Sequence, residues 1–349
     1  MSATVPNILL SNGVRMPALA IGTAPLSTSP SHSPRSHQGY VGFFPERVTR
    51  SVRLALDAGL RHVDTALLYR SHEQVAHVIR ASLMEGELDR EDFFLTSKVL
   101  HPPAEAFGMD DTTIDMDEMT PEEVGRTVHR HVQVTLRELG VGYLDLMLLH
   151  WPSPGGGVGG QAEGDGDGED GAGARTGMAE IDPARRAKRI AAWRVLEHYY
   201  SMGWLRAIGT SNFHEVHLQH LMDDGARVRP HVNQIETSVY IRHDGIVRYC
   251  RENGIAVSAF SPFGRGIMGM EEDGVLVSIA SKHGATPGQV ALAYLLHQGF
   301  AVTFYSGKLE RMRGNIEACD IDLDESDVDK LEGLQRSASW GLPSPYTLS

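Results

Sequence analysis

Four side chains that can do acid–base chemistry stand at the ends of short apolar runs: Asp64, Tyr69, Lys98 and His150. Such runs are typical of buried parallel strands, and in closed β/α barrels the chemistry lies at the carboxyl ends of the strands. A free tyrosine, with a pKa of about 10, is a weak acid at neutral pH, but a neighbouring ammonium stabilises its phenolate. A carboxylate would hold the lysine, and an imidazole would orient a carbonyl group. Together the four residues predict a proton donor at a barrel mouth.

Each of these residues also has an ordinary structural interpretation. An aspartate after a strand usually caps a helix or a turn, a lone tyrosine usually packs, a loop lysine is usually solvated, and a histidine before Trp-Pro usually lies in a core. The joint pattern, and no single residue, therefore carries the prediction.

The segments that position these residues alternate in character along the chain. A helical segment, a glycine, an apolar run and a polar residue recur, as in LRELGVGYLDLMLLH. Glycine at such points is typical of a helix end, and the alternation indicates parallel βα units. An open doubly wound sheet is the alternative, but no GxGxxG follows a first strand. Eight strands are predicted, near residues 18–22, 61–64, 93–97, 144–149, 205–209, 231–235, 256–260 and 301–304.

We therefore predict an α/β fold, a single (β/α)8 TIM barrel domain over residues 1–349, with expanded loops at its C-terminal face. Asn12-Gly13 is a strong hairpin turn and predicts an N-terminal β-hairpin over residues 7–17 that closes the barrel bottom. The capping pattern at Thr120-Pro121 and again at Thr286-Pro287 predicts two helix starts.

Three insertions interrupt the alternation, at residues 24–45, 101–119 and 153–178. The last is almost entirely Gly, Asp, Glu and Ala, so it buries too little apolar surface to order itself and is predicted to be a disordered loop. Neutral loop expansion is its simplest interpretation. The other two are interpreted as lids of a substrate pocket.

The composition indicates an ordinary acidic globular protein. The 349 residues carry a formal net charge of −13, which argues against a nucleic-acid surface. Two cysteines allow no disulfide framework, the N-terminal stretch is no secretory signal, and no apolar run reaches the roughly 18 residues of a membrane span. We expect a cytoplasmic protein without nucleic-acid or membrane partners.

From about Ile8 to Leu334 the chain resembles the aldo-keto reductases, NAD(P)H-dependent (β/α)8 barrel enzymes. The resemblance rests on many motifs in the expected order, namely LSNGVRMPALAIGT, ALDAGLRHVDTALLY, TSK, LGVGYLDLMLLHWP, GWLRAIGTSNF, VNQIE, FSPFGRG, TPGQVALAYLL and the spaced set Ser306, Arg311 and Asn315.

The resemblance implies reduction of an aldehyde or ketone to an alcohol by hydride transfer from NADPH. It implies that Tyr69 donates the proton and that Lys98 and Asp64 tune the acidity of its hydroxyl. It also implies that His150 orients the carbonyl group and that Trp151 forms a wall of the substrate site. It implies a small-molecule carbonyl substrate, a monomer and no metal. The implied cofactor contacts are Gly22, Thr23, Asp64, Ser211, Asn212, Gln234, Phe260, Ser261, Pro262, Phe263, Gly264, Arg265, Tyr305, Ser306, Arg311 and Asn315.

Several positions depart from the family pattern. Tyr305 and Gly314 stand where many members have lysine and glutamate, and that lysine contacts the 2′-phosphate of NADPH. Arg311 remains, and a guanidinium binds a phosphate bidentately, so NADPH is favoured and NADH is the alternative. Ala24 and Leu100 replace aromatic residues of the substrate pocket, which predicts a pocket that is either wider or reshaped by the inserted loops.

Two other functions are weighed against the reductase. A nicotinamide-binding regulatory or partner-binding protein on the same barrel is the main alternative, since fold does not fix function. The intact set of four acid–base residues favours the enzyme. A metal-dependent barrel hydrolase has no support, because the histidines are scattered and no HxH follows the first strand.

Overall fold

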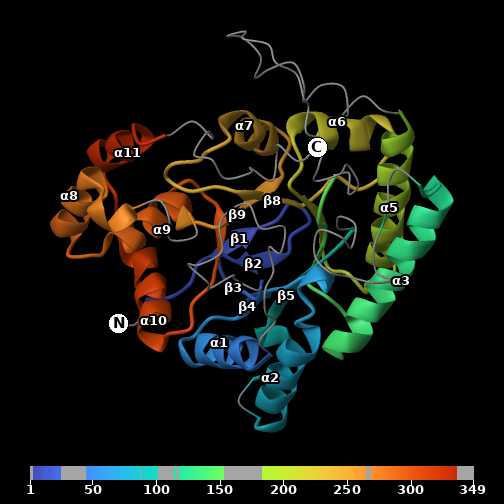
Figure 1. The fold of residues 1–349 in the computed structure, drawn as a ribbon, viewed down its shortest axis with the longest axis horizontal. Coiled ribbons are helices and arrows are strands. Elements are labelled where there is room, and N and C mark those ends of the chain that lie inside the picture. Colours follow the sequence, from blue (N-terminus) through green and yellow to red (C-terminus); the bar gives the residue numbers. More distant parts are fainter. Residues whose placement is uncertain are drawn as a thin grey trace, which may run out of the picture.

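Eight parallel strands close into a barrel in the order β10-β3-β4-β5-β6-β7-β8-β9 (Figure 1). The structure, a computed structural model, describes residues 3–24, 45–86, 88–100, 114, 118–152, 183–264 and 269–335. The predicted barrel is confirmed, and each strand overlaps its predicted range, although β7 begins three residues later than predicted. The strands are β3 (Leu19–Gly22), β4 (His62–Asp64), β5 (Phe94–Val99), β6 (Leu146–Leu149), β7 (Ile208–Ser211), β8 (Val232–Glu236), β9 (Ala256–Phe260) and β10 (Ala301–Phe304).

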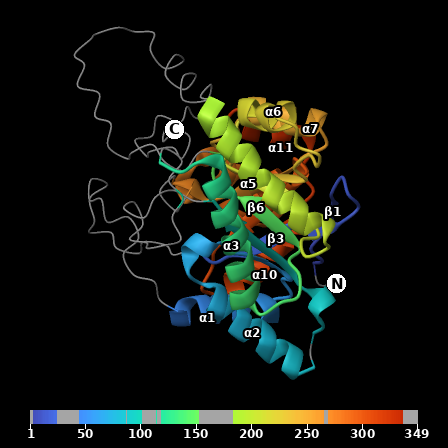
Figure 2. The ribbon, with the colours of Figure 1, turned by 90° about the vertical axis from the view of Figure 1, so that its right-hand side faces the viewer.

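Helices surround the barrel on all sides (Figure 1), as expected for a fold in which helices cross over between parallel strands. They are α1 (Pro45–Asp57), α2 (His72–Met84), α3 (Pro121–Leu139), α5 (Pro183–Ser201), α6 (Glu215–Asp223), α7 (Asp244–Glu252), α8 (Gly274–His283), α9 (Pro287–His297), α10 (Leu309–Glu317) and α11 (Glu325–Glu332), with 3-10 turns η1 (Leu67–Tyr69), η2 (Arg90–Asp92), η5 (Met270–Glu272) and η6 (Ala318–Asp320). Neighbouring helices pack on each other as well as on the sheet, and Figure 2 shows α3 and α5 side by side.

Local sequence signals fix where two of these helices begin. The Thr120 hydroxyl accepts a hydrogen bond from the Glu123 N–H at 3.3 Å, and the Glu123 carboxylate accepts one from the Thr120 N–H at 2.8 Å. Thr286 and Gln289 form the same reciprocal pair at the start of α9. Both predicted capping boxes are confirmed, and each satisfies backbone donors that the first turn leaves open.

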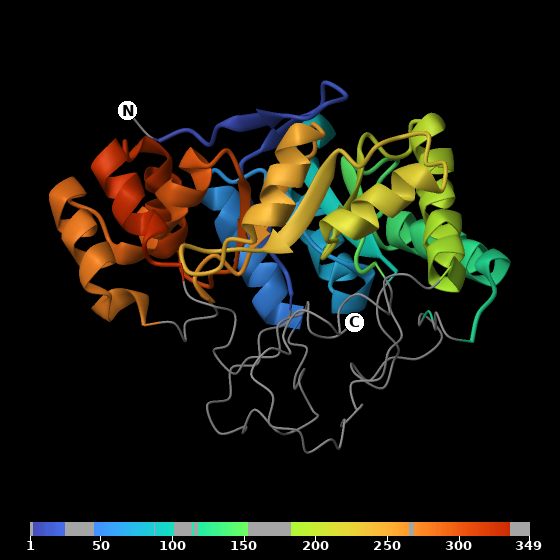
Figure 3. The same cartoon turned by 90° about the horizontal axis from the view of Figure 1, so that it is seen from above.

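The N-terminal hairpin closes one end of the barrel, as predicted. Its strands β1 (Asn7–Leu9) and β2 (Arg15–Pro17) are antiparallel, and Figure 3 shows them lying across that end. Leu10 and Met16 of the hairpin are buried in one apolar cluster with residues such as Phe94 and Val232, which begin their strands. The bottom of the barrel is therefore packed, and a site is expected at the end where the strands finish.

A buried carboxylate ties together the starts of β5, β6 and β7. Asp145 is fully buried, and it accepts hydrogen bonds from Arg90 at 2.8 Å, from Arg206 at 2.8 Å and from the Leu95 N–H at 2.9 Å. The Arg90 guanidinium also lies 3.9 Å from the centre of the Tyr143 ring, a cation–π contact. A carboxylate with its oxygens satisfied in this way is stable when buried.

The three predicted insertions fall mostly outside the described residues, so the predicted lids and the predicted disordered loop at 153–178 stay predictions. Within the described ranges, no helix is both long enough and apolar enough to cross a lipid bilayer.

Replacing Asp145 with asparagine should lower the free energy of unfolding by about 3 kcal/mol, because two guanidinium groups lose their charge partner. Urea unfolding followed by circular dichroism measures the change. The control is Glu122→Gln, which breaks an exposed ion pair with Arg126 on α3 and should cost less than about 0.5 kcal/mol. Equal losses in the two variants would show that the Asp145 cluster does not hold the strand starts together.

Candidate active site

Asp64 and Lys98 form a buried ion pair at the end of the barrel where the strands finish. The Lys98 ammonium lies 2.5 Å from Asp64 Oδ1, and the two residues are 0% and 3% exposed. Alternate residues of a strand face the same side, so His62 and Asp64 on β4 face Thr96 and Lys98 on β5 inside the barrel. His62 Nε2 lies 2.9 Å from Thr96 Oγ1, one layer below the ion pair.

Two opposing effects act on the Lys98 ammonium. Burial lowers the pKa of Lys98 below its usual value, and the charge and hydrogen bond of Asp64 oppose that shift. The ammonium also donates to the Thr65 carbonyl at 3.0 Å. A buried lysine held by one carboxylate and one carbonyl is a fixed, poorly hydrated charge, which acts strongly on any neighbouring group.

Tyr69 and His150 complete the predicted group of four. The Lys98 ammonium lies 5.0 Å from the centre of the Tyr69 ring, and the rings of Tyr69 and His150 meet edge to face with centres 5.7 Å apart. The rings of Trp151 and His150 stack with their centres 6.2 Å apart. The structure thus brings together all four predicted acid–base residues and the predicted aromatic wall.

A hydrogen bond across the barrel joins this group to three predicted amide and hydroxyl side chains. The Gln234 amide on β8 donates to Asp64 Oδ2 at 2.7 Å, and β8 lies opposite β4 in the ring of strands. The Ser211 hydroxyl donates to the backbone carbonyl of Gln234 at 3.0 Å, and the Asn212 amide donates to the backbone carbonyl of His150 at 2.9 Å. Buried Asn212 Oδ1 has no hydrogen-bond partner among the described residues.

The other predicted cofactor residues follow β9 and β10, which are neighbours in the barrel. After Phe260, the Gly264 N–H donates to the Ser261 carbonyl at 2.9 Å, so the chain makes a tight turn there. After β10, the Ser306 carbonyl accepts from the Ser51 hydroxyl at 2.7 Å. Of the remaining predicted positions, Gly22 ends β3, Thr23 follows it, Pro262 and Phe263 lie within the turn, Tyr305 follows β10, Arg311 and Asn315 lie on α10, and Arg265 lies outside the described residues.

Sequence reasoning missed a group of buried polar residues behind the ion pair. The Ser71 hydroxyl lies 2.9 Å from the hydroxyl of Thr65 and 2.9 Å from that of Thr23. His72 lies 2.9 Å from Ser97, the residue before Lys98. The only sequence signal was a polar pair, Ser71-His72, shortly after Tyr69, and such a pair also suits an ordinary helix start.

A histidine caps the helix that follows the Ser211–Asn212 segment. The His214 N–H at the start of α6 donates to His217 Nδ1 at 3.1 Å, so that nitrogen carries no proton. Burial, reinforced by the nearby Arg189 charge, lowers the pKa of His217 to about 2. The neutral imidazole therefore belongs to the folded state of this segment.

The fold and site define a class of protein: a (β/α)8 barrel with a lysine, a carboxylate, a phenol and an imidazole grouped at its mouth. Comparison with known proteins narrows the class. The sequence matches the Aldo/keto reductase family over residues 33–336. This chain belongs to that family, and the predicted resemblance is confirmed.

Characterised relatives and solved structures agree over nearly the whole chain. Aldose reductase B of Dictyostelium discoideum is 29% identical over 88% of this chain and 90% of its own. Human aldo-keto reductase family 1 member C4 is 28% identical over 97% of this chain and 94% of its own. The structure of a Bombyx mori aldo-keto reductase in complex with NADP superposes with a TM-score of 0.71 at 26% identity, over 96% of this chain and 94% of that one.

The free energy of unfolding should fall at acid pH because the unfolded chain takes up a proton on His217 that the folded chain excludes. The unfolded chain takes up this proton near the ordinary histidine pKa of about 6.5, whereas the folded chain excludes it down to a pKa of about 2. Stability is therefore complete above the upper value and falls by about 1.4 kcal/mol per pH unit below it. His217→Asn offers an oxygen in place of Nδ1 and does not titrate, so its unfolding free energy should fall less between pH 7 and pH 5.

Urea unfolding at several pH values measures this difference. The matched control is His297→Asn at the end of α9, where the side chain is exposed. It should follow the wild type at every pH. If His217→Asn also follows the wild type, the neutral imidazole does not contribute to the acid sensitivity.

Proposed function

We propose that this protein is an NADPH-dependent carbonyl reductase that converts an aldehyde or ketone into an alcohol, with Tyr69 as the proton donor. The observation that carries the proposal is the buried Lys98–Asp64 pair beside the Tyr69 ring. A fixed ammonium stabilises the phenolate that remains after Tyr69 gives up its proton. The alcohol dehydrogenase or carbonyl reductase type of activity follows from this step.

The residues at the mouth suit a nicotinamide ring. Asn212 Oδ1 is a buried acceptor with no partner among the described residues, which fits the N–H2 of a carboxamide. The ring of Phe260 at the end of β9 provides an apolar face for stacking. When bound, a reduced nicotinamide would supply the hydride.

Each of the four acid–base residues has a separate part in the proposed step. Tyr69 donates its O–H to the substrate oxygen as negative charge develops there. Lys98 stabilises the phenolate, and Asp64 holds Lys98 in place. His150, packed edge to face against Tyr69 and backed by Trp151, orients the carbonyl oxygen toward the phenol.

NADPH is proposed over NADH on two grounds. Arg311 is exposed on α10, close in sequence to Lys308, and both are able to bind a 2′-phosphate. Two solved aldo-keto reductase structures similar to this chain are complexes with NADP and NADPH. Tyr305, which replaces a lysine of the family, is proposed to line the same phosphate site.

The wider organisation belongs to the same proposal. Residues 1–349 form a single barrel domain, and the enzyme is a cytoplasmic monomer that acts on a small carbonyl compound. The acidic composition, with a net charge of −13, supports a freely dissolved protein rather than one bound to nucleic acid.

The Tyr69→Phe variant should lose about 10²-fold or more of the wild-type kcat, because general acid catalysis of this kind contributes about 10² to 10⁴. Oxidation of NADPH and NADH, followed at 340 nm over a panel of aldehydes and ketones, measures it. The phenylalanine ring keeps the packing against His150, so cofactor binding should be retained. NADPH should give the lower KM of the two cofactors.

The matched control is Tyr249→Phe on α7, where the phenol hydrogen-bonds to Gln219 at 3.1 Å, away from the proposed chemistry. It should keep the wild-type rate. Wild-type protein that binds NADPH tightly but turns over no carbonyl compound in the panel would overturn the reductase and favour a regulatory role.

A further inference from the structure

A chain of three hydrogen-bonded side chains runs from the barrel strand that carries Lys98 to the outer helices. His72 Nε2 lies 2.9 Å from the Ser97 hydroxyl, and His72 Nδ1 lies 2.8 Å from Glu138 Oε2 near the end of α3. A carboxylate only accepts hydrogen bonds, so Nδ1 carries a proton and Nε2 faces the Ser97 hydroxyl. This chain joins β5, α2 and α3.

The same three residue types form the triad of many hydrolases, but access excludes that chemistry here. Ser97 is 0% exposed and His72 is 1% exposed, so no substrate reaches the hydroxyl. Ser97 points outward from the barrel because its strand neighbour Lys98 points inward. The chain of hydrogen bonds therefore acts on the geometry of the site and not on a second substrate.

The hydrogen bonds between Ser97, His72 and Glu138 hold the short segment that carries Tyr69. Tyr69 ends the 3-10 turn η1, and α2 begins three residues later at His72. Arg70, between them, has a φ of 53°, the left-handed region that residues with a Cβ adopt only at a cost. A strained connection of this kind persists when the residues around it are fixed on both sides.

The fixing contacts lie on both sides of Arg70. Before it, the backbone carbonyl of Thr65 accepts a hydrogen bond from the Lys98 ammonium at 3.0 Å. After it, Ser71 lies 2.9 Å from the Thr65 hydroxyl, and His72 lies 2.9 Å from Ser97. Both ends of the Tyr69 segment are thus bonded to the strands that supply Asp64 and Lys98.

We propose that His72, held by Glu138 and bonded to Ser97, is a positioning residue that sets Tyr69 against the Lys98 ammonium. The proposal rests on the proposed function, since it assigns His72 a part in the same proton transfer. Without the His72–Ser97 hydrogen bond, the start of α2 is no longer tied to β5, and the Tyr69 phenol moves away from the Lys98 ammonium. Displacements of about 1 Å in such a group lower rates by up to about 10².

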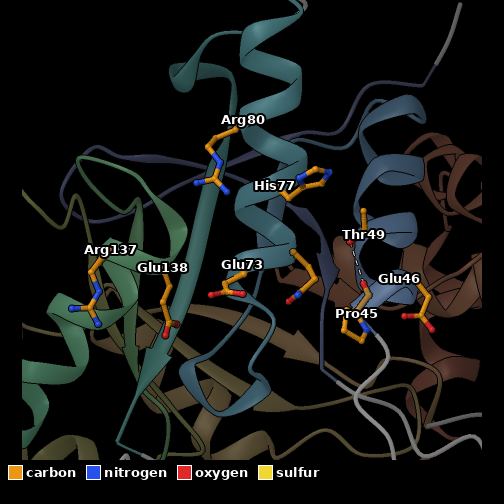
Figure 4. Close-up of a pocket in the computed structure, with 9 residues that line it drawn as sticks. Pro45, Glu46, Thr49, Glu73, His77, Arg80, Arg137 and Glu138 are labelled. Carbon is orange, nitrogen blue, oxygen red and sulfur yellow. Dashed lines mark hydrogen bonds between the residues drawn. The ribbon is translucent and has the colours of Figure 1, made fainter.

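Glu138, the outer member of this hydrogen-bonded group, reaches solvent. Glu138 lies in the wall of a cavity of about 540 Å³ between α1, α2 and α3, and its side chain is 35% exposed. Figure 4 shows Glu73 of α2 beside it, with His77 of the same helix farther along toward Thr49 of α1. His77, exposed on the helix that carries His72, makes a matched control.

Two substitutions at position 72 separate the two hydrogen bonds. A glutamine places its amide end near the Nε2 position and keeps the bond to Ser97, whereas an asparagine places its amide near Nδ1 and keeps the bond to Glu138. His72→Asn should therefore lower kcat about tenfold or more. His72→Gln should recover most of that rate. His77→Asn should match the wild type.

NADPH binding, followed by quenching of tryptophan fluorescence, and thermal unfolding accompany the kinetics. We expect the loss in kcat with an unchanged NADPH Kd and an unchanged carbonyl KM, a split that general loosening of the fold would not give. Ser97→Ala removes the same bond from the other side and should reproduce the kcat of His72→Asn, which keeps the test sound if that variant folds poorly.

The outcomes separate this inference from the proposed function. If the wild type reduces carbonyl compounds and both His72→Asn and Ser97→Ala keep its kcat, the positioning role is wrong and the reductase stands. Equal losses in His72→Asn and His72→Gln would also overturn the role assigned to the Ser97 bond. A wild type without turnover contradicts the proposed function itself, and the fluorescence titration then reports whether NADPH binds.

Discussion

The ion pair between Lys98 and Asp64 is the interaction on which the mouth of this barrel depends. A lysine that is 0% exposed is unfavourable without a counter-charge, because desolvation penalises the ammonium. Asp64 supplies that charge at 2.5 Å. The Gln234 amide donates to the other Asp64 oxygen, and the Thr65 carbonyl accepts a second hydrogen bond from the Lys98 ammonium. These contacts hold the charged groups of Lys98 and Asp64 on more than one side, which restricts the arrangement of the groups beside them.

The barrel topology makes this arrangement available. Asp64 and Lys98 come from adjacent strands, whereas Gln234 comes from the strand opposite, and only a closed sheet brings these three to one point. The alternation of strand residues then gives each strand two tasks. Near the end of β5, Lys98 points inward, and its outward neighbour Ser97 bonds the strand to α2 through His72.

The sequence alone predicted the barrel, the hairpin and the grouping of the acid–base residues, for identifiable physical reasons. Apolar runs, helix caps and the Asn12-Gly13 turn are local signals, and Thr120 and Thr286 cap their helices as those signals require. Polar residues at parallel strand ends meet because of the topology.

Other contacts could not be predicted because they depend on packing between distant residues or on backbone atoms. The Thr65 carbonyl that accepts from Lys98 has no side-chain signature, and the bond from Gln234 to Asp64 joins residues that are 170 positions apart. The partnership of His72 with Glu138 likewise depends on how α2 packs against α3. Spacing in a single sequence does not report such contacts.

Strain and stabilisation are separated between the two ends of the barrel. Five non-glycine residues of the described ranges have a positive φ, and all lie in connections on the mouth side: Arg70 after η1, Leu100 after β5, Asn212 after β7, His243 between β8 and α7, and Ser261 after β9. Each such residue costs of order 1 kcal/mol or more.

The opposite end carries contacts that offset this cost. Asp145 binds two arginines and a backbone N–H there, and the hairpin seals the apolar cluster around Met16. A site that needs side chains aimed into one small space requires unusual backbone turns, and it keeps them only on a scaffold that is fixed elsewhere. The division between the two ends is what allows Tyr69, His150 and Asn212 to hold their places around the ion pair.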